Sequence, residues 1–181
     1  DTFRQALGDA LAGLAEDVTV KALGITHQRG TVIPVDAAGA PLSAALCDSD
    51  SRAATVEELR GLGVDPVAYY RRTGCPFVSF NGMAKILWAR VHAPELYHRA
   101  AAWLSPQDFL VSALIGRVTV TEGSASRNGS LAVGAHRLVA ELFPGEAFLQ
   151  HDCVSVGTSC GRVAETWCRD FPALKGAEVI A

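Results

Sequence analysis

The chain has 181 residues, of which 49% are hydrophobic and 19% are charged, and this composition suits one domain with an ordinary buried core. Its formal net charge is −3 and it contains no run of lysine or arginine, so the sequence predicts neither a nucleic-acid partner nor an anionic membrane surface as a partner. It also lacks an apolar run long enough to cross a membrane and the pattern of a signal peptide at its start, which together predict a cytoplasmic protein.

The first part of the chain predicts one helix followed by three strands. Apolar residues recur at helical spacing over residues 2–17, which is typical of an amphipathic helix packed on a sheet. β-branched residues dominate residues 18–26, and this favours a buried strand. We expect a second strand over residues 31–36 that turns through residues 37–40 into a third strand over residues 42–47.

Polar side chains follow the first and the third of these strands. They are His27, Gln28 and Arg29 in one cluster, and Asp48, Asp50 and Arg52 in the other. Because open α/β sheets usually bind ligands beyond the carboxyl ends of their strands, two such clusters joined by a hairpin predict one small polar pocket. The alternative for Asp50 is structural, since Asp50 or Ser51 could cap the helix that begins near Thr55.

The rest of the chain alternates helices with short strands. Helices are expected at residues 53–62, 65–70, 83–92, from residue 94, at 106–115 with Ser105 as the N-cap, and at 134–142. Strands are expected at residues 102–104, 118–121, 153–156 and 178–180, and a loop at residues 122–130. The alternation predicts a layered α/β sheet.

Several sequence blocks together resemble a known family. Residues 24–29 read GITHQR, a hairpin follows, and residues 50–53 read DSRA. Four further blocks are MAKILW (83–88), APELYHRA (93–100), WLSPQDFL (103–110) and ASRNGSL (125–131). In this order they are similar to the motifs of the FGGY carbohydrate kinases, a family that includes glycerol kinase and xylulokinase.

The resemblance implies an α/β domain of the actin-like, ribonuclease-H-like type that is incomplete because the first β-hairpin is lacking. Residues 1–181 would form the central and C-terminal part of the N-terminal, substrate-side domain, without the C-terminal domain. The sheet would then have an exposed edge beside residues 18–25, which predicts aggregation or a homo-oligomer. The family phosphorylates a sugar or polyol hydroxyl with ATP and Mg²⁺, both of which would be bound mainly by other parts of the chain.

The resemblance also implies which residues contact the sugar and leaves this segment without a catalytic residue. The expected substrate-binding residues are Gln28, Arg29, Asp48, Asp50, Phe80 and Asn81. Such polar side chains donate and accept hydrogen bonds in fixed geometry, as sugar hydroxyls require. Gly30 replaces a glutamate of glycerol kinase, and Asp48 replaces a tryptophan of many relatives, which predicts a more polar substrate than glycerol. Structural alternatives are a surface salt bridge for Arg29 and core packing for Phe80.

Other chemical groups of the chain carry weaker hypotheses. Lys85 is expected on a solvated helix face, and Arg127 is expected to satisfy backbone carbonyls in a Gly/Ser loop. No GxxxxGK[ST] motif occurs, and the five histidines have no nucleophile spaced to partner them in a hydrolase triad. The five cysteines form no CxxC pair, so we expect reduced thiols and no metal site.

Two functions therefore remain from different classes. In the first, the segment is part of an ATP-dependent sugar or polyol kinase and supplies sugar-binding residues, although the isolated segment is inactive. In the second, it is a non-catalytic fragment or relic that binds a small polyol or a protein partner.

Overall fold

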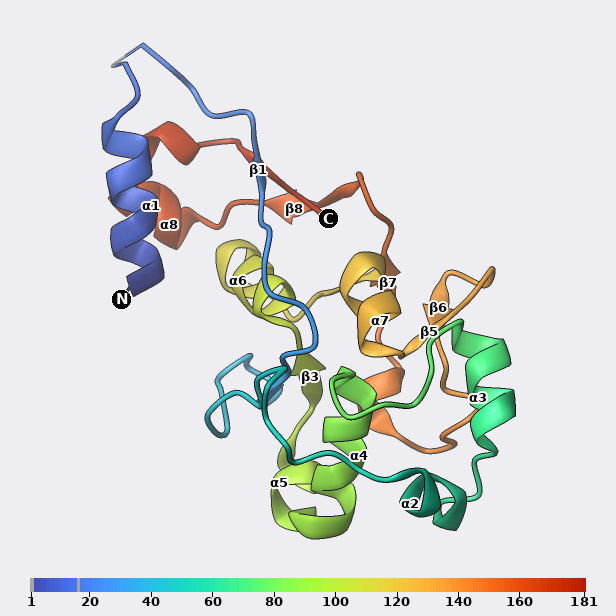
Figure 1. The fold of residues 1–181 in the computed structure, drawn as a ribbon. Coiled ribbons are helices and arrows are strands. Elements are labelled where there is room, and N and C mark those ends of the chain that lie inside the picture. Colours follow the sequence, from blue (N-terminus) through green and yellow to red (C-terminus); the bar gives the residue numbers. More distant parts are fainter. Residues whose placement is uncertain (1, 16) are drawn as a thin grey trace.

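The computed structural model describes residues 2–15 and 17–181, which form short strands and helices around two hydrophobic cores (Figure 1). A three-stranded sheet has the order β1 (Ala22–Gly24), β9 (Glu178–Ile180), β8 (Ser159–Arg162). Strands β1 and β9 are parallel, with Leu23 opposite Val179, while β8 is antiparallel to β9. Within the described residues β1 pairs on one side only, so one edge of this sheet is open.

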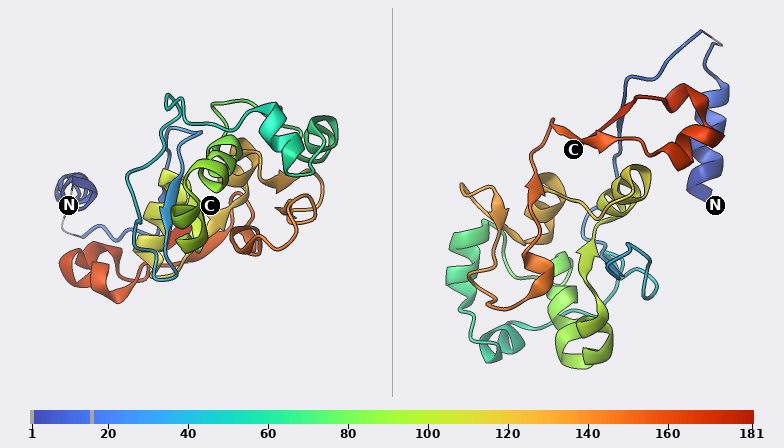
Figure 2. Two further views of the ribbon diagram at one scale, coloured as in Figure 1. Left: turned by 90° about the horizontal axis from the view of Figure 1, so that it is seen from below. Right: turned by 180° about the vertical axis from the view of Figure 1, so that it is seen from behind.

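The smaller core lies between this sheet and three helices. They are α1 (Thr2–Ala12), α6 (Pro106–Ile115) and α8 (Glu165–Asp170). Figures 1 and 2 show α1 and α8 side by side at one end of the molecule. Phe3 of α1 meets Trp167 of α8 edge-on, with ring centroids 5.8 Å apart, and Val111 and Leu114 of α6 are buried in the same core.

The larger core fills the rest of the molecule. Its helices are α2 (Val56–Gly61), α3 (Pro66–Thr73), α4 (Gly82–His92), α5 (Pro94–Arg99) and α7 (Glu122–Asn128). Its paired strands are β2 (Ile33–Val35) with β3 (Ala102–Leu104), β4 (Val120–Thr121) with β7 (Cys153–Val154), and β5 (Leu131–Ala132) with β6 (Arg137–Leu138). The 3-10 turns η1 (Ala147–Leu149) and η2 (Pro172–Leu174) complete the described elements.

Side-chain caps explain where several helices begin. Thr55 and Glu58 form a capping box at α2, so the helix is capped by Thr55 and the alternative of a cap at Asp50 or Ser51 was wrong. Ser105 accepts a hydrogen bond from the Asp108 N–H at the start of α6, and Pro106 occupies the first turn, as the sequence predicts.

Three expected elements differ in the structure. Residues 42–47 form no strand and contribute one isolated bridge, from Leu46 to Val32, while Pro41 bridges to Val35. Strand β2 pairs instead with β3. Residues 122–130 were expected to be a loop, but Thr121 caps α7 and Gly129 ends it in the left-handed conformation. Residues 134–142 were expected to be helical, but a turn that contains His136 at φ 51° leads into β6.

The first helix and the first strand are shorter than expected. The helix expected over residues 2–17 ends at Ala12 in α1, and residue 16 of that range lies outside the described residues. The predicted buried strand over residues 18–26 is limited to Ala22–Gly24, where Ala22 and Gly24 are exposed because this strand lies at the sheet edge. Among the described residues, no helix is both long and apolar enough to cross a membrane.

Candidate sugar-binding site

Three loops meet at Gly30, directly after the segment that follows β1. Gly30 is buried and has φ +87°, a conformation that L side chains rarely adopt. A Cβ at this position would lie 2.5 Å from the Phe80 carbonyl oxygen and 3.3 Å from the Asp48 Cβ. The missing side chain therefore allows the turn after β1 to contact the loop of Asp48 and the loop that leads into α4.

Gln28 and Arg29 are exposed on this turn. Within residues 2–15 and 17–181 the Arg29 guanidinium forms no ion pair, so the structure gives no support to the surface salt bridge that was its alternative role. The neighbouring His27 ring contacts the Gln28 carbonyl oxygen at 2.8 Å, and partial burial lowers the pKa of His27. The turn thus presents an amide and a guanidinium to solvent beside Gly30.

Asp48 and Asp50 lie on the second loop but have different environments. Asp48 is half-buried as a residue, and its carboxylate accepts a hydrogen bond from the Ser49 N–H at 2.8 Å. The Asp50 carboxylate is already paired, because the Arg52 Nε and Nη2 donate to it at 3.0 and 2.6 Å. This hydrogen bond holds the pKa of Asp50 below its ordinary value. Arg52 also lies over the Trp88 ring, 5.6 Å from its centroid.

Phe80 and Asn81, on the third loop, point in different directions. Phe80 is 45% exposed, so the alternative prediction that it packs in the core was wrong. Asn81 is 0% exposed, and its amide donates to the Pro76 carbonyl at 2.6 Å and accepts from Arg127 Nη1 at 2.9 Å. The amide of Asn81 is therefore occupied inside the protein, where it holds the loop that presents Phe80.

Two cationic side chains near the loops, Arg127 and Lys85, have environments in the structure that differ from those predicted from the sequence. Arg127 lies in α7 and not in a loop, and its guanidinium covers the Phe80 ring at 5.1 Å while it binds the Asn81 side chain. Lys85 was expected on a solvated helix face, but it is 0% exposed in α4. The unbroken apolar surroundings of Lys85 in the block MAKIL were the sequence signal for its burial.

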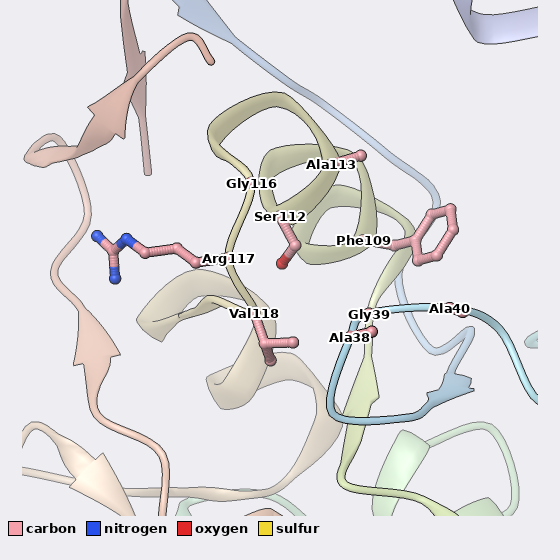
Figure 3. A pocket seen from close by; sticks show the side chains of 9 residues that line it. All are labelled: Ala38, Gly39, Ala40, Phe109, Ser112, Ala113, Gly116, Arg117 and Val118. Atoms are coloured by element: carbon pink, nitrogen blue, oxygen red, sulfur yellow. The ribbon is translucent and has the colours of Figure 1, made fainter. Parts of the chain in front are cut away.

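Two cavities are lined by residues other than those of the three loops. One of about 400 Å³ opens at the carboxyl ends of β1 and β9 and is lined by Gly24, Ile25, Thr26, Gln107, Thr121, Gly123, Val156, Ile180 and Ala181. Another of about 270 Å³ lies between residues 38–40 and α6 (Figure 3). In Figure 3 the Arg117 side chain points away from residues 38–40, and its Nη2 donates to the Cys160 carbonyl at 2.5 Å.

No group of three or more His, Cys, Asp or Glu side chains in the described part of the chain could hold a metal ion. Cys153, Cys160, Cys168 and His151 accordingly form no metal-binding group among these residues. Burial raises the pKa of Cys153 to about 12, so its thiol is protonated at neutral pH.

Comparison with known proteins identifies relatives of the whole segment. The profile of the FGGY family of carbohydrate kinases, N-terminal domain, matches residues 2–137. The xylulose kinase of Streptomyces coelicolor is 31% identical over 144 residues, which cover 76% of this chain and 29% of that protein. The autoinducer-2 kinase of Salmonella choleraesuis is 26% identical over 184 residues, 97% of this chain and 34% of that protein.

Solved structures of sugar kinases share the fold. The gluconate kinase from Lactobacillus acidophilus superposes with a TM-score of 0.84 at 16% identity, over 98% of this chain and 36% of that one. Plasmodium falciparum glycerol kinase with ADP gives a TM-score of 0.75 at 22% identity, over 98% and 37%. The fold is thus the α/β, actin-like fold of these kinases, and the chain spans about a third of their length. The chain belongs to the FGGY family of carbohydrate kinases.

Proposed function

We propose that this chain is part of an ATP-dependent carbohydrate kinase and that the three loops around Gly30 bind the sugar or polyol that accepts the phosphate. The observation that carries this proposal is the contact of the loops at Gly30, with Asp48 and Phe80 on two of them and Arg29 exposed on the third. We infer that the three loops bring a guanidinium, a carboxylate and an aromatic ring to one sugar-binding surface.

These groups suit a polyhydroxylated ligand. The Arg29 guanidinium donates hydrogen bonds, the Asp48 carboxylate accepts them, and the exposed Phe80 ring offers an apolar face. Gln28 adds an amide that both donates and accepts. Asn81 is buried and its amide is engaged within the protein, so we assign it to the support of the Phe80 loop. Asp50 is paired with the exposed Arg52, and we assign this pair as a unit to a sugar contact.

We assign ATP and Mg²⁺ to other parts of the kinase. Mg²⁺ in kinases is held by carboxylates together with the phosphates, and the described residues contain no acidic cluster that fits a metal ion. The relatives are kinases about three times as long, and one solved relative carries ADP. We therefore expect that the 181-residue segment alone shows no ATP turnover above a buffer control.

The substrate that fits best is a sugar or polyol with more polar groups than glycerol. Asp48 places a carboxylate at one wall of the site, and Gly30 leaves no side chain between the loops. Two relatives are named for xylulose and for autoinducer-2, and one solved neighbour is named for gluconate. Open-chain ketoses, polyols and sugar acids are therefore the classes to test.

The test is a panel of these sugars with the whole protein. A bound sugar at about one hundred times its Kd stabilises the folded state by about 2.7 kcal/mol, which raises Tm measurably. We expect at least one member to raise Tm and to be phosphorylated at the expense of ATP. A sugar that binds without phosphorylation would favour the non-catalytic alternative, and a panel in which no member binds would contradict the proposed site.

A further inference from the structure

Lys85 is buried directly behind the loops of the proposed site. It is 0% exposed, and the α4 residues on both sides of it, from Met83 to Leu87, are buried as well. Its Nζ donates to the Ser79 carbonyl at 2.9 Å and to the Asp48 carbonyl at 3.4 Å. A buried ammonium is costly unless it is hydrogen-bonded, so these contacts are what keep Lys85 inside the protein.

The two carbonyls belong to different walls of the site. Asp48 is itself an expected sugar-binding residue, and Ser79 directly precedes Phe80. The loops are far apart in sequence, and β-pairing in the described residues does not join them. The ammonium of Lys85 therefore bridges the wall that carries the carboxylate and the wall that carries the aromatic ring.

The charges around Lys85 support this arrangement. Burial lowers the pKa of Lys85, and the carboxylates of Asp50 and Asp48 oppose that shift. Two further groups act on the pKa of Lys85: Cys47 of the second loop raises it and the Arg127 guanidinium of α7 lowers it. The positive charge is thus placed where two acidic side chains of the site partly compensate it.

We propose that Lys85 is a positioning residue that sets the separation of Asp48 and Phe80 and thereby determines which sugar the site prefers. This inference rests on the proposed function. Lys85 contacts backbone carbonyls of the two loops, so it acts on the sugar through the residues that those loops carry. Loss of the ammonium would leave two carbonyls without this donor and would release the two walls from each other.

The first test is Lys85→Met in the whole protein, which keeps an unbranched side chain and removes the charged donor. Lys175→Met, at an exposed lysine outside the site, is the matched control. The readout is the ratio of kcat/KM for two accepted sugars, because this ratio does not depend on the fraction of folded enzyme. We expect the ratio to change about tenfold in Lys85→Met, with the KM for ATP unchanged, and to stay constant in Lys175→Met.

Lys85→Arg covers the case in which Lys85→Met does not fold. It retains a cation with several donors but holds them in a planar fork at a different distance from the helix. We expect this variant to fold and again to change the ratio for the two sugars. An unchanged ratio in either folded variant would overturn the inference.

The second test does not require kinase activity. Amide hydrogen exchange of residues 47–50 and 76–81 is measured in wild type, Lys85→Met and Lys175→Met. We expect faster exchange in both segments of Lys85→Met only, because the bridge between the loops is lost. Wild-type exchange in both segments would overturn the role of Lys85. A protein that phosphorylates no sugar would overturn the proposed function. The exchange rates would then still test whether Lys85 joins the two loops.

Discussion

The two cores of the molecule differ in how deeply their helices are buried. The larger core buries most of α4, and the hydrogen bonds of Asn81 and Lys85 tie the site loops to it. In the smaller core neither α1 nor α8 has a buried residue among those described, and the rings of Trp167 and Phe171 are only half-buried. The proposed sugar site therefore lies on the more tightly packed part of the chain.

Helix α6 belongs to both cores and connects them. Its Val111 and Leu114 lie in the smaller core, while Phe109 packs against the larger one. At the start of α6, Asp108 is 2% exposed and accepts hydrogen bonds from the Thr121 N–H and hydroxyl at 3.1 and 2.8 Å. Substitutions at Gly30, at Asp108 and at the α1–α8 contact therefore test the packing of the larger core, of the helix shared by both cores and of the smaller core.

Gly30→Ala should have the largest effect, because the added Cβ strains a positive φ and collides with the Phe80 carbonyl. We expect a loss of about 3 kcal/mol in the free energy of unfolding, measured by urea denaturation. Gly63→Ala is the matched control, since Gly63 has φ +81° and nothing within 4 Å of the added Cβ. It should cost about 1 kcal/mol, from backbone strain alone. Equal losses in the two variants would refute the loop contact at Gly30.

Asp108→Asn should stabilise the protein at neutral pH. Burial raises the pKa of Asp108 to about 6, so ionisation of this carboxyl in the folded state costs free energy that grows from about pH 4 to about pH 6. The amide oxygen of asparagine can accept the same bonds from Thr121 without a charge. We expect the variant to gain up to about 3 kcal/mol over wild type at pH 7 and nothing at pH 3.5. A stability difference that does not change with pH would show that the carboxyl does not titrate in this way.

Ala22→Lys tests the open edge of the smaller sheet. Exposed strand edges pair with other chains, and a lysine on the edge opposes this. Ala22 is exposed on β1, so the substitution should leave folding intact and reduce association of the 181-residue chain, measured by light scattering. A wild-type chain that is monomeric at high concentration would contradict association through β1.

Arg4→Ala should have the smallest effect. Arg4 pairs with Asp170 and lies 4.3 Å from the centroid of the Trp167 ring, but its side chain is 42% exposed. Exposed ion pairs and cation–π contacts each contribute less than about 1 kcal/mol, so we expect a loss of about 1 kcal/mol. A loss as large as that of Gly30→Ala would mean that the α1–α8 contact is as tightly packed as the site.

The sequence predicts the family, the helices α4, α5 and α6, the Ser105 cap, and the strands β3 and β9. It fails where one local pattern fits two structures. Residues 134–142 have apolar residues at helical spacing, but the turn at Gly134 and His136 directs them into β6. The Gly/Ser-rich residues 122–130 look like a loop, yet the Thr121 cap and the burial of Ser124 and Ala125 stabilise α7.

The chemistry of the candidate site is easier to predict from sequence than its geometry. Polar residues at the ends of expected strands indicate Gln28, Arg29 and Asp48. The contact of Asp48 and Phe80 at Gly30 depends on how distant loops pack, and no local pattern encodes it. For the same reason the inward direction of Asn81 becomes visible only in the structure, whereas the apolar neighbours of Lys85 in the sequence already indicate its burial.

Arg29→Ala in the whole protein tests whether the loops around Gly30 bind the sugar, with Arg71→Ala on the exposed surface of α3 as the matched control. Removal of a charge-assisted hydrogen bond costs about 1.5–3 kcal/mol. We predict that kcat/KM for the accepted sugar falls about ten- to a hundredfold in Arg29→Ala, with the KM for ATP and the Tm unchanged, and that Arg71→Ala behaves as wild type. If Arg29→Ala lowers Tm but leaves kcat/KM for every accepted sugar unchanged, Arg29 is structural and the sugar lies elsewhere.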